Sequence, residues 1–417
     1  MNARRAGPLL AVVATLLLAC TQAEERTTIL VASFPDLDRA TKEALPAWRR
    51  AHPDIDVKLV SREYGDHHTA MMTALATGSG LPDVIAIDRD YIGKFAASGG
   101  LLDLSSPPYA EARPREKFVA FALAQAAGPA GRLAAIPTDI GPGTLLYRKD
   151  IVERAGVSEE DLTRSWESYL ESGKRIKAAT GAYLLAHAAD IRDIYVRAGL
   201  TEGEGLFFDR AGRSLVETPR FVRAFELGLA TRRAGIDANT PHWTNEWSEA
   251  LRRGRVATQM MGAWLVGHLK NSIAPDTAGK WRAANLPGGF FGSYGGSFYA
   301  IPVKAKNKAA AWEFVKFMTM ERDVQLASLR AVNAFPALRA ALDDPVFERP
   351  VEFLGGQVAG VMWRDVAARI PVVPTNRNDS VAAAIVGAEF DKVLNENKDI
   401  RVALADAKSL IEQRIRR

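Results

Sequence analysis

In the first quarter of the chain, short apolar runs alternate with segments whose apolar residues recur every three or four positions. The short, β-branched runs predict buried strands, and the periodic segments predict amphipathic helices. In chain order, strands are expected at residues 27–34, 55–60 and 82–88, and helices at residues 38–51 and 67–77. Strands that alternate with helices indicate a parallel sheet, so the expected fold class is α/β.

The ends of these strands supply the first candidate binding residues. Ligands of open parallel sheets bind just past the carboxyl ends of the strands. The first strand ends at Ser33 and Phe34, and Tyr64 follows the second. The third strand ends at Asp88 and Arg89. We expect Phe34, Tyr64, Asp88 and Arg89 to contact a ligand directly. The same rule also places Ser33 near the binding site.

The segment of residues 135–150, in the middle of the chain, is rich in glycine and proline. Asp139 lies in it between two Gly/Pro-rich turns. Asp commonly stabilises turns, so a turn-forming role is one interpretation. Contact with a ligand is the other, and we include Asp139 among the candidate binding residues. Gly141-Pro142-Gly143 lacks the spacing and the GK[ST] ending of a phosphate-binding loop.

Residues 254–320 read as a helix end, three short strands separated by glycine turns, and an amphipathic helix. Gly295 and Gly296 permit a sharp turn or a close approach of the backbone to a ligand, which a Cβ would resist. Trp264 stands beside another glycine turn, where an aromatic face can be presented to a ligand. We therefore expect Trp264, Gly295, Gly296 and Ser297 at a binding site.

The eight tryptophans separate into two groups by their positions. A structural role is expected for Trp48, Trp166, Trp281 and Trp312. The others lie at loops or helix ends, where a rigid aromatic can form a platform for a ligand; they are Trp243, Trp247, Trp264 and Trp363. Because tryptophan is often mostly buried, packing in the core is the competing interpretation for each.

The last part of the chain predicts a loop followed by helices. Residues 331–336 form the loop, and its Asn333 and Phe335 are expected near the binding site. Two amphipathic helices are expected at residues 381–394 and 400–415.

The N-terminus has the pattern of a secretory signal. Arg4 and Arg5 precede an apolar core at residues 9–18, which is too short to span a bilayer comfortably. The segment ends Leu17-Leu18-Ala19-Cys20, which resembles a bacterial lipobox. We expect residues 1–19 to be a lipoprotein signal peptide and Cys20 to carry the lipid; an ordinary signal peptide that contains a cysteine is the alternative.

Composition narrows the classes of function. Cys20 is the only cysteine, so the chain has no internal disulfide and no cysteine metal site. The formal net charge is +5, with basic and acidic residues interspersed, whereas a nucleic-acid-binding protein would cluster its basic residues. GxSxG and HExxH motifs are absent, and the adjacent His67 and His68 are poorly spaced to share a metal ion.

Several of these segments, in this order, resemble the carbohydrate-binding extracellular solute-binding proteins of bacterial ABC importers (family 1, maltose- and oligosaccharide-binding-like). The likeness covers residues 74–104, 135–156, 165–181, 250–264, 286–288, 295–320 and 331–336 and the two helices expected at residues 381–394 and 400–415, which is nearly the whole chain after the signal. One departure is Arg164, where the family usually has proline. The resemblance implies a two-lobed type II periplasmic-binding-protein fold, in which each lobe is a mainly parallel sheet covered by helices. Residues 27–138 and 298–337 would form the N-terminal lobe, and residues 139–297 and 338–417 the C-terminal lobe.

The same resemblance implies a function. The family captures a sugar or short oligosaccharide by closure of the lobes and delivers it to a membrane permease driven by a separate ATPase. The expected partners are therefore a carbohydrate and the permease subunits, with no cofactor, no metal and no nucleic acid. We expect a monomer, anchored through Cys20 in the periplasm or at the cell surface. The sequence contains no Walker motif.

Two alternatives stay open at the level of sequence. The same fold could bind a non-sugar solute such as a polyamine, an amino acid or a polyol; a polyamine site would contain several acids, and here only Asp88 and Asp139 are expected in the cleft. A secreted glycan-cleaving lipoprotein would need two carboxylates that flank a bond. The acids available for that role are Asp190, Asp193, Glu246 and Glu249.

Overall fold

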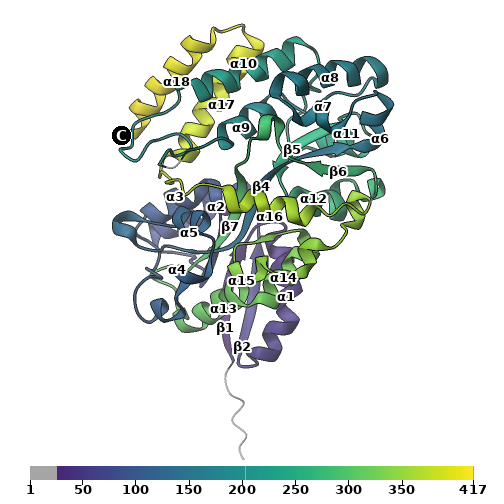
Figure 1. Cartoon of the computed structure of the whole chain (residues 1–417). Coiled ribbons are helices and arrows are strands. Elements are labelled where there is room, and N and C mark those ends of the chain that lie inside the picture. Colours follow the sequence, from purple (N-terminus) through teal and green to yellow (C-terminus); the bar gives the residue numbers. More distant parts are fainter. Residues whose placement is uncertain (1–25, 202, 417) are drawn as a thin grey trace, which may run out of the picture.

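The computed structural model describes residues 26–201 and 203–416 (Figure 1). The predicted signal peptide and Cys20 lie outside the described residues. The strands are β1 (Thr27–Ser33), β2 (Ile55–Ser61), β3 (Val84–Asp88), β4 (Ile136–Arg148), β5 (Thr258–Gly262), β6 (Trp281–Ala284), β7 (Ser293–Ala300) and β8 (Phe335–Pro336).

Helices cover these strands in both lobes. They are α1 (Leu37–Ala51), α2 (Tyr64–Thr77), α3 (Arg89–Ala97), α4 (Pro114–Lys117), α5 (Ala120–Gln125), α6 (Lys149–Arg154), α7 (Glu159–Thr163), α8 (Trp166–Thr180), α9 (Ala189–Arg197), α10 (Pro219–Arg233), α11 (Asn245–Arg252), α12 (Leu265–His268), α13 (Lys308–Met320), α14 (Arg322–Val332), α15 (Arg339–Leu342), α16 (Ala359–Arg369), α17 (Asp379–Asn395) and α18 (Ile400–Ile415). Short helical turns, such as η5 (Pro287–Gly289), connect some of them.

The N-terminal lobe contains the parallel sheet predicted from the alternating pattern. β1 lies between β2 and β3 and pairs in parallel with both. β3 then pairs antiparallel with β7, which completes the order β2-β1-β3-β7. The carboxyl ends of the three parallel strands therefore meet at one edge of the sheet, the edge that faces the other lobe (Figure 1).

β4 runs through the middle of the molecule and connects the two lobes. Its first half pairs antiparallel with β7 and β8, and its second half pairs antiparallel with β5 and β6. The pairing with β7 is irregular at Asp139 and again before Pro142, where the register shifts. The strands β4, β7 and β8 thus lie side by side near the residues where the chain was expected to cross between the lobes. The exact lobe boundaries stay a prediction.

The C-terminal lobe is built on the second half of β4. The apolar segment at residues 183–186 forms only single parallel bridges, between Tyr183 and Val256 and between Leu185 and Asp237. Helices α8, α9 and α10 cover this region, and α17 and α18 pack on α10 at the end of the lobe (Figure 1).

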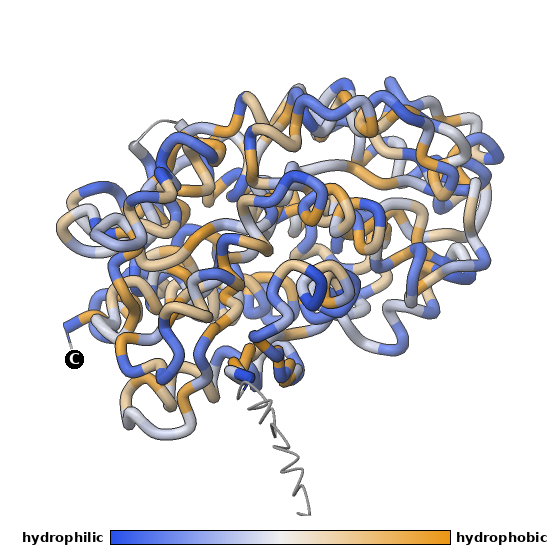
Figure 2. Tube along the Cα trace, turned by 90° about the horizontal axis from the view of Figure 1, so that it is seen from below, coloured by the Kyte–Doolittle hydropathy of each residue, from blue (hydrophilic) through white to orange (hydrophobic). Residues whose placement is uncertain are grey.

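Buried apolar side chains of the described residues form one large cluster, two smaller ones and a small group of Ala40, Val332 and Ala334. The large cluster joins Trp48 on α1, Phe298 on β7 and Phe314 on α13, and extends to Trp281 on β6. The smaller clusters lie around β4, β5 and α8, and between α10, α17 and α18. Polar and apolar residues alternate along the outer helices, as expected for helices with one buried face (Figure 2).

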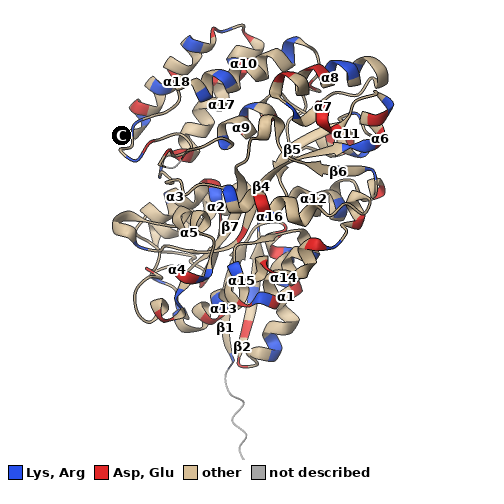
Figure 3. Ribbon diagram, viewed as in Figure 1, with Lys and Arg blue, Asp and Glu red and all other residues tan. Residues whose placement is uncertain are grey.

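Charged residues of both signs are interspersed over the lobes (Figure 3), in agreement with the pattern read from the sequence. In the part of the chain that the structure describes, no helix combines the length and apolar character needed to cross a membrane.

Phe298 tests how strongly the lobe core depends on β7. Its side chain is completely buried, on a strand that pairs with β3 on one side and β4 on the other. Phe298→Ala should lower the free energy of unfolding by about 3–5 kcal/mol, because the buried ring is lost and its neighbours are left around a cavity. Val402→Ala, at a side chain 51% exposed on α18, is the control and should change stability by less than about 0.5 kcal/mol. Urea unfolding measures both. Equal effects of the two changes would contradict the assignment of β7 to the core.

Candidate functional site

A cavity of about 600 Å³ lies between the lobes. The N-terminal lobe lines it with Phe34, Pro35, Asp36, Leu37, Ala40, Glu63, Tyr64, Gly65, Asp88 and Asp90. The segments between the lobes contribute Asp139, Gly295, Gly296, Ser297, Val332 and Ala334. The remaining wall consists of Trp243, Met261, Trp264, His268 and Tyr294. The cavity is therefore polar and acidic on one side and aromatic on the other.

The carboxyl ends of the parallel strands supply the acidic wall, as the rule for parallel sheets predicted. Phe34 follows β1, and its ring contacts the edge of the Tyr64 ring with centroids 5.7 Å apart. The Tyr64 hydroxyl donates a hydrogen bond of 2.8 Å to Asp88 Oδ1. Burial and the charge of Asp88 raise the pKa of Tyr64, so this phenol stays protonated and keeps donating.

Asp88 and Asp90 lie two residues apart at the start of α3, but their pKa values are shifted in opposite directions. Asp88 caps the helix by accepting a bond from Asp90 N, and burial raises its pKa to about 7. Burial would also raise the pKa of Asp90, but the positive charges of Arg197 and Arg89 outweigh it and hold that pKa far below its usual value. Near neutral pH, Asp90 is thus a permanent anion, whereas Asp88 carries a proton part of the time and can donate or accept.

Asp139 stands opposite Ser297 where β4 and β7 pass between the lobes. Its Oδ1 is buried and has no hydrogen-bond partner in the protein. Burial raises the pKa of Asp139 to about 6, against hydrogen bonds from Ser297 that favour the anion. A buried acceptor without a partner is costly, so a ligand hydroxyl or amine that bonds to it would relieve that cost.

The aromatic wall is formed by a stack of side chains. The Trp264 indole N–H donates to the Tyr294 carbonyl oxygen at 2.7 Å, which fixes the orientation of its ring. The ring of Trp243 lies nearly parallel to that of Trp264, at an angle of 20° with centroids 6.0 Å apart. Trp243 is 56% exposed. The two indoles thus form a broad apolar surface at the cavity.

Glycines allow this close packing. A Cβ on Gly141 or on Gly262 would collide with the Tyr294 carbonyl group, and one on Gly295 would come within 2.7 Å of Trp264 Nε1. Gly295 and Gly296 also have φ values of 86° and 126°, which side chains disfavour. The turn at these two glycines therefore brings the backbone of β7 against the indole of Trp264.

Polar contacts join the lobes on both sides of the cavity. Arg197 on α9 binds Asp90 on α3 through two hydrogen bonds of 2.9 and 3.0 Å. His268 Nε2 on α12 lies 2.6 Å from Asp36 Oδ2, just after β1. These contacts hold the lobes together over the cavity.

Nine of the sequence-predicted site residues line this cavity, and the other five do not. Trp247 is completely buried and its indole donates to Gln259 Oε1. Phe335 and Trp363 are buried in the large apolar cluster. Arg89 is buried beside Asp90. Asn333 ends α14 and donates to the Ala263 carbonyl, so it contacts the C-terminal lobe rather than the cavity.

Several lining residues were not predicted as site residues. Asp90 lies two residues after the end of β3, and the rule that identified Asp88 could have found it. Asp36 lies three residues after the end of β1. His268 lies one helical turn after Trp264, but no pattern of residues predicts the short helix α12. Met261, Val332 and Ala334 carry no sequence signal of binding.

Across residues 26–201 and 203–416, no three His, Cys, Asp or Glu side chains come together in an arrangement that could hold a metal ion. The chemistry of the cavity is that of hydrogen bonding and aromatic packing.

The electrostatics of Asp139 can be tested by the pH dependence of stability. The pKa of Asp139 is about 6 in the folded state and 3.8 in the unfolded chain. Between these pH values the folded state binds more protons than the unfolded chain, so stability falls as pH rises through this range. Asp139→Asn removes the buried charge and should make the ligand-free protein more stable at pH 7.5 by on the order of 1–2 kcal/mol. Urea unfolding at pH 7.5 and 4.5 measures this. At pH 4.5 the difference should fall to roughly a third of its value at pH 7.5, because the unfolded chain still releases most of this proton above pH 3.8. A variant less stable than the parent at pH 7.5 would contradict the prediction.

Comparison with known proteins adds relatives of this chain. A family model described as bacterial extracellular solute-binding protein matches residues 32–324. The lactose-binding protein of Rhizobium radiobacter is 27% identical over 388 residues, covering 86% of this chain and 88% of that protein.

Solved structures with the same fold include two sugar complexes. One is an ABC-transporter-associated binding protein from B. animalis subsp. lactis Bl-04 in complex with beta-1,6-galactobiose (TM-score 0.77, 22% identity, covering 93% of this chain and 97% of that one). The other is the GacH receptor of Streptomyces glaucescens GLA.O, solved unliganded and with acarbose (TM-score 0.77, 20% identity, covering 93% and 98%).

Proposed function

This chain belongs to the bacterial extracellular solute-binding proteins, and on that premise we propose that it captures a sugar or short oligosaccharide between its lobes and delivers it to an ABC importer. The two-lobed, type II periplasmic-binding-protein fold predicted from the sequence is confirmed by its structural neighbours. Similar proteins are named for saccharides or were solved with them, which supports the assignment of the same class of ligand here.

The observation that carries the proposal is the composition of the cavity. Sugars have apolar C–H faces and hydroxyl groups at their edges. The stacked indoles of Trp243 and Trp264 offer a flat apolar surface. Asp88 lies on the wall of the N-terminal lobe, and Asp139, on the strand that connects the lobes, has an unused acceptor. One sugar ring can therefore pack on the indoles and bond to the carboxylates, and single neutral hydrogen bonds contribute only about 0.5–1.5 kcal/mol each, so several are needed.

Capture proceeds by closure of the lobes. The strands β4, β7 and β8 connect the lobes, while the walls of the cavity come from both. A ligand that contacts both walls binds the closed form better than the open form and shifts the population toward it. The bond between Arg197 and Asp90 forms only when the lobes are together, so it adds to the stability of that closed form.

The proposal includes the partners and the location of the protein. The closed form docks on membrane permease subunits, and a separate ATPase supplies the energy. Cys20 carries a lipid that holds the protein, as a monomer, in the periplasm or at the cell surface. The N-terminal lobe comprises residues 27–138 and 298–337, and the C-terminal lobe comprises residues 139–297 and 338–417. The protein binds its ligand without converting it.

A thermal-shift screen of residues 26–417 tests the class of ligand. The screen compares mono- and oligosaccharides with polyamines and amino acids, and a saccharide far above its Kd should raise the Tm. Trp264→Ala should weaken binding of that saccharide roughly 10- to 100-fold, because the aromatic surface for the sugar is lost. Leu410→Ala, at an exposed position on α18, is the control and should bind as the parent does. A polyamine or amino acid as the only ligand found would overturn the sugar assignment, and turnover of a glycan would make the protein an enzyme.

Arg197→Met tests closure. This change removes the partner of Asp90 in the other lobe and leaves only Arg89 of its own lobe beside it, so the closed form loses two hydrogen bonds between the lobes. The saccharide found in the screen should then bind at least about tenfold more weakly, because the competent form is less populated. Arg252→Met, which breaks a pair with Glu249 inside one helix, is the matched control. Small-angle scattering should show a larger radius of gyration for Arg197→Met alone. Unchanged affinity and radius would rule out a role of this pair in closure.

A further inference from the structure

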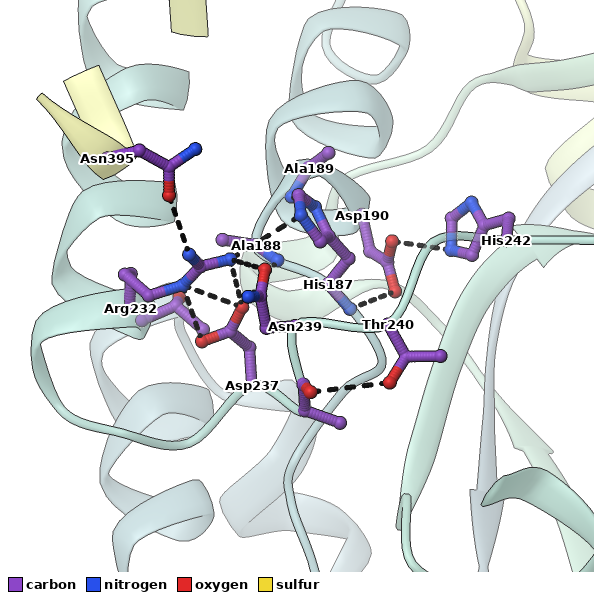
Figure 4. A network of polar contacts seen from close by, with 12 residues as sticks. His187, Ala188, Ala189, Asp190, Arg232, Asp237, Asn239, Thr240, His242 and Asn395 are labelled. Atoms are coloured by element: carbon purple, nitrogen blue, oxygen red, sulfur yellow. Dashed lines mark hydrogen bonds and ion pairs between the residues drawn. The ribbon is translucent and has the colours of Figure 1, made fainter. Parts of the chain in front are cut away.

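A network of polar side chains lies outside the residues that line the cavity (Figure 4). Its centre is Asp190, in the first turn of α9, whose side chain is fully buried. His242 Nε2 lies 2.5 Å from Asp190 Oδ1, and Gln259 Nε2 donates to Asp190 Oδ2 at 3.1 Å. One buried carboxylate thus ties the start of α9, the loop before α11 and the strand β5 together.

The residue next to His242 is Trp243, the most exposed aromatic side chain of the cavity wall. Its backbone has φ 64°, a left-handed conformation that a bulky residue adopts only when its surroundings hold it there. On its C-terminal side, the Thr244 side chain caps α11 by accepting a bond from Trp247 N. On its N-terminal side, the contact of His242 with Asp190 holds the backbone in place.

A second branch of the network supports the same loop. The Trp247 indole donates to Gln259 Oε1 at 3.1 Å, and Gln259 in turn donates to Asp190. The Trp243 ring packs against the Trp247 ring, with centroids 5.0 Å apart. Asp190 therefore reaches Trp243 along two routes, through the backbone at His242 and through Gln259 and Trp247.

We propose that the ion pair of His242 with Asp190 positions Trp243 for ligand binding, so that His242 and Asp190 control affinity without touching the ligand. The inference rests on the proposed function, because it takes the cavity as the site where the sugar binds. His242 is a positioning residue in this account, and the state of its proton decides how firmly the aromatic wall is held.

The charges around His242 give the direction of the pH effect. Burial lowers the pKa of His242, but the attraction of Asp190, with a contribution from Asp193, outweighs both burial and the repulsion of Arg192 and raises it above 6.5. Gln259 on β5 and Trp247 on α11, which also face His242, carry no charge. Arg232 faces Asp237 instead (Figure 4).

Because the folded pKa is raised, the contribution of the pair is fully present below the unfolded pKa of 6.5 and is lost as pH rises through the folded value. The neutral imidazole carries no charge, so its attraction to the Asp190 carboxylate is weaker than that of the protonated ring. Trp243 should therefore be held firmly at pH 6 and less firmly at pH 9.

The experiment compares four proteins: the parent, His242→Gln, Trp243→Ala and the double variant. Binding of lactose and maltotriose, measured by calorimetry at pH 6, 7.5 and 9, should weaken about three- to tenfold in the parent as pH rises. His242→Gln should bind more weakly at pH 6 and show a smaller pH dependence than the parent; the part that remains comes from Asp88 and Asp139, whose raised pKa values lie near the same range. In the Trp243→Ala background, His242→Gln should have no further effect, because its role acts through that indole. His187→Gln, a neighbouring histidine whose ring does not contact the Asp190 carboxylate, is the control and should keep the parental pH profile.

A second readout needs no sugar. Quenching of Trp243 fluorescence by acrylamide, taken as the difference between the parent and Trp243→Phe, should increase from pH 6 to pH 9 and should be independent of pH in His242→Gln. If neither sugar binds at any pH, these probes fail as ligands of the proposed function while the fluorescence still tests the positioning. A parental pH profile in His242→Gln, or additive effects in the double variant, would overturn the inference.

Discussion

Two antiparallel strands, β4 and β7, run side by side between the lobes, and the position of every wall of the cavity depends on their pairing. Asp139 and Ser297 face each other across it. The glycines at 141, 262 and 295 let the Tyr294 backbone and the Trp264 indole approach closely, which larger residues would prevent. The same pair of strands therefore both connects the lobes and sets the distance between the acidic and the aromatic wall.

Charge is distributed in this cavity so that each carboxylate has a different role. Asp90 is neutralised by Arg197 from the other lobe and belongs to closure. Asp88 is bonded to Tyr64 and to the start of α3, while Asp139 retains an unbonded oxygen. Because burial raises the pKa of Asp88 and of Asp139, bonds from ligand hydroxyls stabilise charges that the empty protein holds at a cost.

The fold and one wall of the cavity follow from the sequence, since both depend on local patterns. Apolar runs alternating with amphipathic segments gave the parallel sheet, and the ends of its strands gave Phe34, Tyr64 and Asp88. Helix α2 begins at Tyr64, earlier than predicted at His67, because the three polar or small residues before the histidines carry no apolar periodicity.

The aromatic wall was only partly predictable. Trp243 and Trp247 are close in sequence, but Thr244 lies between them as the cap of α11. Trp247, in the first turn of that helix, is therefore buried in the core, whereas Trp243, before the cap, stays exposed. Contacts between lobes, such as His268 with Asp36, join residues that are remote along the chain, and no local pattern reveals them. The same holds for Asp190, which is linked to Trp243 through His242 and through Gln259 and Trp247.

The most direct test of the central claim is a crystal structure of the protein with the saccharide that gives the largest thermal shift. The account predicts a sugar ring packed on the indole of Trp264, a hydroxyl group bonded to Asp139, and the bond between Arg197 and Asp90 intact. A saccharide bound outside this cavity, or bound to a single lobe with the lobes apart, would contradict it.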